Sequence, residues 1–322
     1  MKLLFKVVFV ISALFFGMIS GAWAWTPSKN IEIVVPFPPG GATDKLGRMI
    51  SEIFNRHGWN SVVSNRPGAD TVIASNYVAE APADGYTLYL GSNGFIDANL
   101  VYGAPGIKYT QDSFTPIVPL GTGSFVLVAS NGAPVTNYAE FKTYIRNNPN
   151  KFVLGFWNTY TSKIFLEWAR LEGLPEPNII IYKGSAPLMV DVMGEHVTFA
   201  IDTVTSVRQH YAANKLKVIG TLDPEGVRLI RAINPQAQIT DISRLVPAAG
   251  INLYYGLFAP ASLDSSIVKA IQDLLNNTFT GSDQTYRNAL SESSIVNPGG
   301  NSALLRQRQT YLYNQFAKSV KR

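Results

Sequence analysis

The sequence predicts an α/β protein built from two doubly wound domains. Apolar runs typical of buried strands alternate along the chain with segments whose apolar residues recur at helical spacing, and this alternation favours largely parallel sheets. The chain has 322 residues, and 46% of them are hydrophobic. A chain of this length is longer than one hydrophobic core usually serves, so we expect two domains. The pattern places the boundary between the domains anywhere from residue 120 to residue 135.

The first 24 residues are predicted to be a cleaved secretory signal peptide. Lys2 and Lys6 supply a basic start, residues 7–19 an apolar stretch, and residues 22–24 an Ala-Trp-Ala cleavage site. A membrane anchor is the alternative, but an anchor needs about 20 apolar residues, and this run is shorter and glycine-interrupted. Removal of 24 residues from 322 leaves 298, beginning at Trp25.

The composition excludes several classes of function. The chain has no cysteine, so it enters an oxidising compartment without disulfides and has neither thiol catalysis nor cysteine metal ligands. Its three histidines, His57, His196 and His210, share no ligand-like spacing, and we expect no metal and no cofactor. Without Lys2 and Lys6, 25 scattered basic residues face 22 acidic ones, which does not favour nucleic-acid binding.

The first domain is predicted to begin with a βαβαβ unit. Residues 31–35 form an apolar run of strand length, followed by a turn rich in proline and glycine at 36–41. An amphipathic helix follows, with one apolar face and an end near Gly58: Leu46, Met49, Ile50, Ile53 and Phe54. A short strand near 62–63, a helix over about 71–81 and a strand over 86–90 complete the unit.

The rest of the chain continues the alternation. After a strand over 125–129, Asn137 and Glu140 form a capping box that opens a helix. Strands are predicted over 151–156, 179–182, 197–201 and 216–220, a loop over 157–161, and helices after that loop, over 186–193 and over 204–213. Residues 221–249 lack periodicity, and a strand over 254–258 and helices over 266–279 and 303–319 end the chain.

The loop after the first strand is a candidate anion site. A strand, a Gly40-Gly41 turn and a helix together present free backbone N–H groups and a positive dipole end. An ordinary tight turn is the alternative. Either Thr43 or Asp44 can cap the helix. A carboxylate would repel an anionic ligand, so we expect Asp44 to cap the helix and Thr43 or the Ala42 N–H to contact ligand.

Polar side chains follow other predicted strands. Ser92 and Asn93 offer a hydroxyl and an amide suited to a carboxylate or hydroxyl, although they also suit a plain polar turn, and their spacing is not that of a nucleophile elbow. Asp202 ends a strand, where it either binds a ligand group or caps the next helix. Lys183 is interpreted as a solvated surface residue.

Five blocks of sequence resemble the Bug or TctC-like family, the periplasmic solute-binding proteins of tripartite tricarboxylate transporters. They occur in the family's order and rough spacing across nearly the whole mature chain: Pro-Phe-Pro-Pro-Gly-Gly-Ala-Thr-Asp at 36–44, Asn-Arg-Pro-Gly-Ala at 65–69, Asp-Gly-Tyr-Thr-Leu at 84–88 with Gly91-Ser92, Tyr-Lys-Gly-Ser-Ala-Pro at 182–187, and Gly-Leu-Phe-Ala-Pro at 256–260.

This resemblance implies a type II periplasmic-binding-protein fold, in which two doubly wound α/β lobes are joined by two crossovers and enclose a ligand cleft. With crossovers near Ser124 and Ile251, lobe 1 comprises residues 25–124 and 251–322, and lobe 2 comprises residues 125–250. The family's ligand carboxylate lies against the first loop. The expected ligand-binding residues are Phe37, Gly40, Gly41, Ala42, Thr43, Ser92, Asn93, Asn158, Thr159, Tyr160 and Asp202.

The loop at 157–163 departs from the family pattern. The family usually has small residues there, followed by a Ser-His pair, whereas this chain has bulky Trp157 and Tyr160 and the pair Ser162-Lys163. These different residues do not change the expected position of the loop, but they leave the identity of the ligand open. We expect the bulky side chains to favour a compact or flat acid over a branched tricarboxylate.

The expected function is that of a monomeric periplasmic receptor. It would capture a small carboxylic acid between two lobes, without chemistry, and deliver it to integral membrane subunits of a tripartite tricarboxylate-type transporter. A receptor that reports its ligand to a sensor kinase is an alternative. An enzyme on the same scaffold is a third reading, but it would have to rely on isolated carboxylates such as Asp202.

Overall fold

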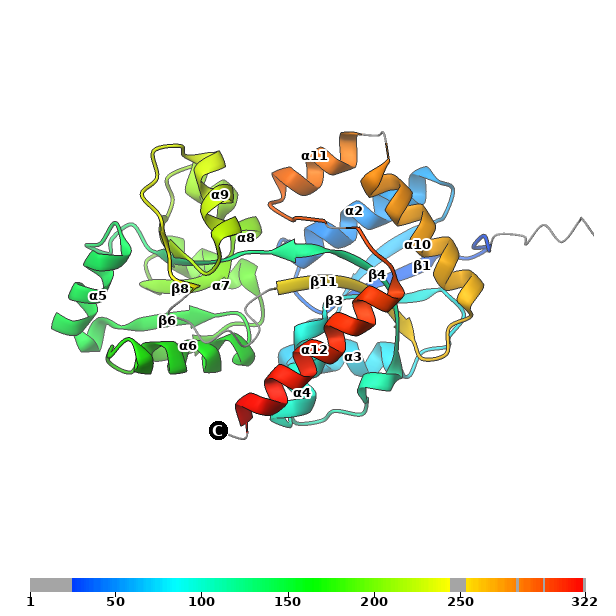
Figure 1. The fold of residues 1–322 in the computed structure, drawn as a ribbon, viewed down its shortest axis with the longest axis horizontal. Coiled ribbons are helices and arrows are strands. Elements are labelled where there is room, and N and C mark those ends of the chain that lie inside the picture. Colours follow the sequence, from blue (N-terminus) through cyan, green and yellow to red (C-terminus); the bar gives the residue numbers. More distant parts are fainter. Residues whose placement is uncertain (1–24, 244–252, 282–283, 298, 321–322) are drawn as a thin grey trace, which may run out of the picture.

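The computed structural model describes residues 25–243, 253–281, 284–297 and 299–320, and Figure 1 shows them as two α/β lobes side by side. The predicted signal peptide (1–24) and the predicted crossover at Ile251 lie outside these residues. Within the described ranges, no helix has the length and apolar character needed to cross a membrane.

The first lobe is built on a five-stranded sheet in the order β2-β1-β3-β11-β4. Its strands are β1 (Ile31–Val35), β2 (Ser61–Asn65), β3 (Thr87–Ser92), β4 (Phe114–Gly123) and β11 (Leu253–Pro260). The first three are parallel, and β11 runs antiparallel between β3 and β4. The helices of this lobe are α2 (Ala42–Arg56), α3 (Val72–Ala79), α4 (Asn93–Tyr102), α10 (Ser265–Thr280), α11 (Gln284–Glu292) and α12 (Ser302–Val320), with short 3₁₀ turns at Ala69–Thr71 and Gln111–Ser113.

The second lobe has a six-stranded sheet in the order β10-β9-β5-β8-β6-β7. Its strands are β5 (Phe125–Ala129), β6 (Val153–Phe156), β7 (Asn178–Ile181), β8 (Phe199–Thr203), β9 (Lys217–Thr221) and β10 (Thr240–Asp241). Strand β5 is antiparallel to β8 and β9, and the other pairs are parallel. The helices are α5 (Tyr138–Asn147), α6 (Thr159–Leu171), α7 (Ser185–Met193), α8 (Val204–Ala212) and α9 (Pro224–Ile233), with a 3₁₀ turn at Pro149–Lys151.

The chain passes from the first sheet to the second within one extended segment. Strand β4 and strand β5 are separated by Ser124, and they belong to different sheets. Figure 1 shows β4 running from one lobe towards the other. The strands of residues 31–123 and 253–260 share one sheet, and those of residues 125–241 share the other. The lobe boundaries at 124 and 251 stay a prediction.

The predicted α/β class with two doubly wound lobes is confirmed, and the structure contains elements that the sequence pattern did not predict. Strand β4 was not predicted, and it contains Pro116 and Pro119. It can do so because it lies at the edge of its sheet, where proline is tolerated. In the aperiodic segment, Asp223 accepts a hydrogen bond from the Gly226 N–H and opens α9 with Pro224 at its first position. Helices α4 and α11 were also not predicted. Helix α6 begins at Thr159, inside the predicted loop, because Asn158 caps it.

The two lobes are in contact at the loop after β1 and the loop after β7. A Cβ atom added to Gly184 of the second lobe would lie 2.6 Å from the Pro38 side chain of the first, and one added to Gly41 would lie 3.7 Å from the Ser185 Cβ. Aromatic rings also make contact between the lobes. Tyr160 of α6 packs edge-on against Phe316 of α12, with ring centroids 4.6 Å apart. The lobes are therefore closed on each other.

We predict that Gly184→Ala opens the lobes without unfolding either one. Gly184 has φ 168°, an extended conformation that any residue adopts, so the added methyl group conflicts with Pro38 across the cleft. Small-angle scattering should give a larger radius of gyration than for the wild type, with circular dichroism unchanged. Gly41→Ala is the matched control, because its Cβ makes only an ordinary contact. Scattering curves that superpose for wild type and Gly184→Ala would contradict the closed arrangement.

Candidate functional site

A small cavity lies between the lobes where the strands of both sheets end. Its volume is about 10 Å³, room for about one water molecule, and we call it the inner cavity. The first lobe lines it with Phe37, Gly41, Ala42, Thr43 and Tyr255, and the second lobe with Trp157, Ser185, Asp202, Thr203 and Ser206. The described residues that line the inner cavity include no lysine, arginine or histidine.

Helix α2 presents its N-terminus to the inner cavity without a side-chain cap. Gly41 is the N-cap residue with φ −77°, and no side chain bonds to the first turn. Positive φ occurs one residue earlier, at Gly40 (95°), where glycine carries little steric cost. The first N–H groups of a helix have no partner within the helix, so those of Ala42 and Thr43 are available to an anion.

Asp44, the predicted cap, is directed away from the ligand side. Its Oδ2 accepts hydrogen bonds from the Gly40 N–H and Arg48 Nε, both at 2.9 Å, and its Oδ1 accepts one from Asn65 Nδ2 at 2.9 Å. Burial by itself raises the pKa of Asp44, but the hydrogen bonds from Arg48, Gly40 and Asn65 outweigh it and hold the pKa below its usual value. The carboxylate is ionised and neutralised locally, so it stabilises the loop that precedes the helix.

Asp202 lies opposite, at the end of β8. Its Oδ1 accepts a hydrogen bond from the Thr203 N–H at 2.6 Å, and its Oδ2 accepts one from the Ser185 hydroxyl. Complete burial raises the pKa of Asp202 to about 6, although these hydrogen bonds act in the opposite direction. Thr203 in turn caps α8 by accepting from the Ser206 N–H at 3.2 Å. A strand-end carboxyl group is thus held between the N-termini of α7 and α8.

Two donors that line the inner cavity have no hydrogen-bond partner in the protein. They are the Trp157 indole N–H and the Tyr255 hydroxyl, and both residues are at least nine-tenths buried. Buried polar groups are nearly always paired, and an unpaired one costs about 1–3 kcal/mol. One of these residues comes from each lobe, so each lobe contributes an unpaired donor among the residues that line the inner cavity.

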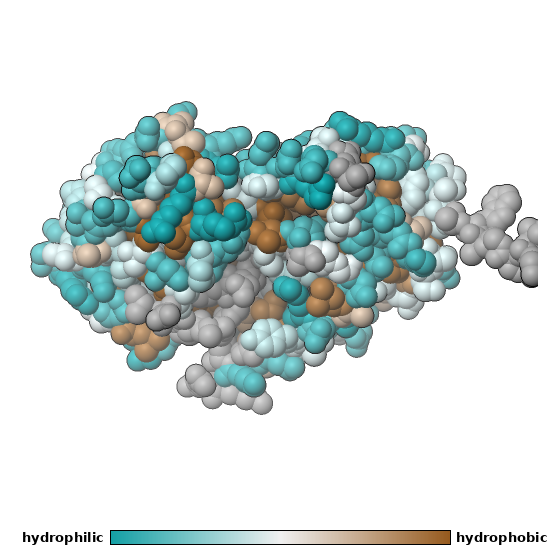
Figure 2. Space-filling model, turned by 45° about the horizontal axis from the view of Figure 1, so that its top comes forward, coloured by the Kyte–Doolittle hydropathy of each residue, from teal (hydrophilic) through white to brown (hydrophobic). Residues whose placement is uncertain are grey.

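Phe37 and Trp157 lie between the inner cavity and a larger space, Phe95 packs against both rings, and Tyr160 packs against Phe95. We call these four residues the aromatic wall. Phe37 and Phe95 of the first lobe each lie 5.2 Å, centroid to centroid, from Trp157 of the second. Behind Phe37 and Trp157 is an outer chamber of about 350 Å³, which both residues also line. Figure 2 shows hydrophobic surface recessed between the lobes and bordered by hydrophilic surface.

The predicted site residues fall into three groups. Those that line the inner cavity are Phe37, Gly41, Ala42, Thr43 and Asp202. Three others lie in a helix or loop next to it. The Gly40 N–H donates to Asp44, the Asn158 Oδ1 accepts from the Thr161 N–H at 2.7 Å, and Tyr160 belongs to the aromatic wall. The others are Ser92, the buried N-cap of α4, Asn93, the first residue of that helix, and Thr159, whose N–H donates to Asp70.

Four residues of the inner cavity were not predicted, and Trp157 was expected only to limit the size of the ligand through its bulk. Ser185 lies in a block whose family resemblance was recognised, and Thr203 and Ser206 have the spacing of an N-cap directly after Asp202. These three carried a usable signal. Tyr255 carried none, because it reaches the cavity through the antiparallel return of β11 into the first sheet.

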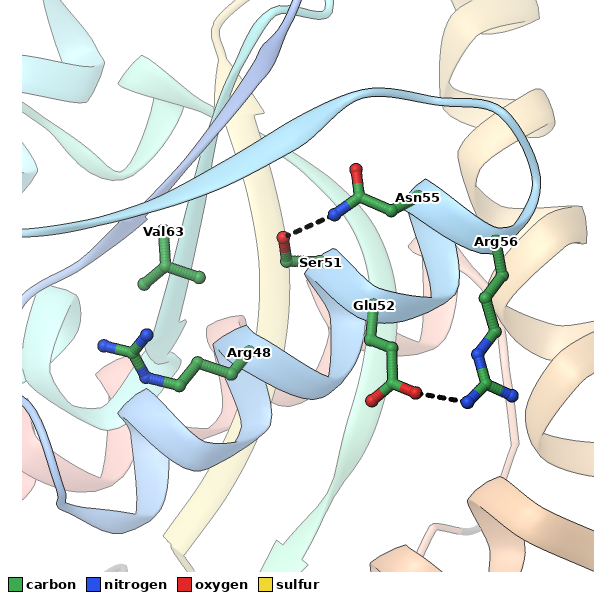
Figure 3. A pocket seen from close by; sticks show the side chains of 6 residues that line it. All are labelled: Arg48, Ser51, Glu52, Asn55, Arg56 and Val63. Atoms are coloured by element: carbon green, nitrogen blue, oxygen red, sulfur yellow. Dashed lines mark hydrogen bonds and ion pairs between the residues drawn. The ribbon is translucent and has the colours of Figure 1, made fainter.

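A wider hollow of about 560 Å³ lies along the outside of α2, and it lacks the converging unpaired groups of a binding site. Figure 3 shows its lining side chains spread along α2, with Val63 of β2 near Arg48. Arg48 is paired with the buried Asp44. Arg56 is paired with Glu52, and an exposed pair of this second kind is worth about 0–1 kcal/mol. Over the described ranges, no three His, Asp or Glu side chains gather as a metal site.

Comparisons with known proteins relate residues 48–310 to one family model, described as tripartite tricarboxylate transporter family receptor. A curated relative from Pseudomonas sp. strain P51, named UPF0065 protein in tcbD-tcbE intergenic region, is 30% identical over 286 residues, 85% of this chain and 80% of the relative.

Solved structures share the fold. The periplasmic binding protein BugD is 24% identical, with a TM-score of 0.80 over 92% of this chain and 97% of its own. An R. palustris protein solved with adipate is 26% identical, with a TM-score of 0.81 over the same shares of the two chains.

We predict that Asp202→Asn stabilises the protein at high pH and not at low pH. The pKa of Asp202 rises from 3.8 to about 6 on folding, so the folded state disfavours its ionised form and loses stability as the pH rises between these values. About two pKa units correspond to about 3 kcal/mol. Asparagine stays neutral and still accepts from the Thr203 N–H.

Urea unfolding measured at pH 4 and pH 8 tests this expectation. The variant should exceed the wild type in unfolding free energy by up to about 3 kcal/mol at pH 8, and the difference should vanish near pH 4. Asp112→Asn, a change at an exposed carboxylate, should leave the pH dependence of the wild type unchanged. A difference between Asp202→Asn and wild type that is the same at both pH values would contradict a buried, titrating Asp202.

Proposed function

The chain belongs to the tripartite tricarboxylate transporter receptor family, and we propose that it is a periplasmic receptor for a small carboxylic acid. In this role it holds the acid between its two lobes, leaves it chemically unchanged, and delivers it to the membrane-embedded subunits of a tripartite tricarboxylate-type transporter. The predicted signal peptide supports export, and the relative solved with adipate supports a carboxylate as the class of ligand.

One observation carries the proposal: a buried cavity between the lobes where hydrogen-bond donors of both lobes converge. The uncapped N-terminus of α2 faces the N-termini of α7 and α8, and Trp157 and Tyr255 add unpaired donors. Helix N-termini bind anions through backbone N–H groups and the helix dipole. A carboxylate has two acceptor oxygen atoms, so it can accept from both sides at once.

Asp202 makes binding depend on protons. A ligand carboxylate in the inner cavity would face this buried carboxyl group, and two adjacent carboxylates do not both stay ionised. The raised pKa of Asp202, to about 6, allows it to take up a proton when the ligand enters. Binding is therefore expected to strengthen as the pH falls from 8 towards 6, and to lose this dependence in Asp202→Asn.

The cavity must widen to admit a ligand. Its volume of about 10 Å³ holds about one water molecule, whereas a carboxylate is larger, so the Trp157 or Phe37 ring has to move. The two sets of donors surround the ligand only when the lobes close, which is hinge closure of the kind known for periplasmic binding proteins. A ligand at 100 times its dissociation constant then stabilises the folded protein by about 2.7 kcal/mol.

Mass spectrometry of whatever copurifies with the mature protein, followed by calorimetry with the acid identified, tests the proposal. The acid should be recovered unchanged after prolonged incubation, and turnover would instead show an enzyme. Cross-linking from the rim of the cleft in native membranes should capture transporter subunits. Cross-links to a sensor kinase and not to a transporter would contradict the delivery step.

We predict that Gly41→Asp weakens carboxylate binding without destabilising the fold. Aspartate is a favourable N-cap residue, so the variant should fold at least as well as the wild type. Its own carboxylate would occupy the N-terminus of α2, where a charge–dipole contact is worth up to about 2 kcal/mol. Calorimetry with the copurified acid should show affinity reduced at least tenfold.

Gly41→Asn is the matched control, because asparagine has the same shape and is an equally good N-cap but carries no charge. It should lose less affinity than Gly41→Asp. Equal losses in the two variants would assign the effect to size rather than to charge, and unchanged affinity in a folded Gly41→Asp protein would remove the α2 N-terminus from the site.

A further inference from the structure

The outer chamber is a largely apolar space that adjoins the inner cavity across the aromatic wall. Its volume of about 350 Å³ lies within the range of small-molecule sites. Proline, aromatic and aliphatic side chains from both lobes supply much of its lining, including Pro36, Pro105 and Ile181. Phe37 and Trp157 line both spaces. Movement of the Phe37 or Trp157 ring, which the entry of a ligand requires, would join the two spaces, so that a ligand with its head in the inner cavity would extend its tail into the outer chamber.

Asp70 and Lys183 are the two charged residues among the described lining of the outer chamber, and their surroundings differ. Asp70 is half-buried and its Oδ1 accepts a hydrogen bond from the Thr159 N–H at 3.2 Å. Thr159 is the first residue of α6, a 13-residue helix of the other lobe. The positive end of α6 is therefore already bound to a carboxylate of the protein. Lys183 is exposed to solvent.

The backbone around Asp70 is strained in a way that holds its carboxylate in this place. Ala69, Asp70 and Thr71 have positive φ values of 47°, 49° and 78°, which cost non-glycine residues free energy and persist only where the surroundings enforce them. Asn99 Nδ2 donates to the Asp70 carbonyl oxygen at 2.6 Å. Strain of this kind gathers at functional sites, and here it directs a negative charge at the outer chamber.

The Trp157 indole N–H supplies an independent sign of a ligand at the same boundary. Its ring is 6% exposed, it lines both spaces, and its Nε1 has no partner in the protein. An oxygen atom near the head of a ligand would satisfy this donor, while the remaining ring faces suit apolar groups. Polar recognition is concentrated at the head, and the tail meets apolar side chains, the half-buried Asp70 and the solvent-exposed Lys183.

From this arrangement, and resting on the proposed receptor function, we propose that the ligand is a monocarboxylic acid with an apolar tail, and that Asp70 excludes dicarboxylates. The head carboxylate binds in the inner cavity and the tail fills the outer chamber. A second carboxylate at the end of the tail would meet the Asp70 charge and would find the α6 N-terminus occupied. Like charges held close together disfavour binding, which is a means of setting specificity.

The test compares acids that differ only in the second carboxylate. The three pairs are butanoate and succinate, hexanoate and adipate, and octanoate and suberate. The affinity of each acid is measured by calorimetry at one pH and ionic strength. The wild type should bind the best monocarboxylate at least tenfold more tightly than its dicarboxylate partner. Asp70→Asn should reduce this ratio to less than threefold while leaving the monocarboxylate affinity within twofold of the wild type.

Asparagine is the informative replacement because it tolerates positive φ and keeps an oxygen that accepts from the Thr159 N–H. Asp70→Gly, which also removes the strain, is the second variant and should give the same loss of discrimination. Asp112→Asn, on the exposed surface, should leave the ratio unchanged.

Wild-type protein that binds adipate as tightly as hexanoate, with an unchanged ratio in Asp70→Asn, would overturn this inference and leave the receptor function standing. Tighter adipate binding that is lost in Lys183→Gln would also overturn it, by assigning the distal carboxylate to Lys183. If no acid in any pair bound while the copurified acid did, the inference would fail and the receptor function would stand, whereas the receptor function itself fails only if the protein binds no carboxylic acid at all, the copurified one included.

Discussion

The uncapped N-terminus of α2 is the constraint on which the rest of the site depends. A helix that begins with glycine leaves its first N–H groups without a side-chain partner, and those groups must be satisfied by water, by the opposite lobe or by a ligand. The chain has a carboxylate at the third helical position, Asp44, but the hydrogen bonds from Gly40, Arg48 and Asn65 keep it facing the loop. The anion position at the helix end is left for a molecule from outside.

The aromatic wall explains how such a site opens and closes. The rings of Phe37 and Phe95 belong to one lobe and that of Trp157 to the other. Each aromatic pair contributes about 0.5–1.5 kcal/mol beyond its buried area. The closed arrangement therefore has packing of its own, and a ligand adds hydrogen bonds to it. In the proposed receptor, specificity would follow from what lies behind the wall, because an apolar chamber with a fixed carboxylate would discriminate among acids by their tails.

Sequence reasoning reached the parts of the site that are continuous in the chain. The turn at Gly40 and Gly41 between an apolar strand and an amphipathic helix was predicted from local pattern, and the family resemblance implied the two lobes and the cleft. What the sequence could not show arises from tertiary structure. The predicted loop at Trp157 becomes a helix start because Asn158 caps α6, and Tyr255 joins the cavity through the return of β11. The role of Asp70 depends on a contact 89 residues away along the chain.

The central claim is that one carboxylate engages both lobes at once, and hydrogen exchange measured by NMR on the mature protein tests it most directly. Addition of the copurified acid should slow exchange of the backbone amides at Ala42 and Thr43 in the first lobe. It should also slow exchange at Ser185 and Ala186, the first residues of helix α7 in the second lobe, whose N-cap offers no side-chain hydrogen bond, with the same dependence on ligand concentration. Protection confined to one lobe, at saturating ligand, would contradict the account.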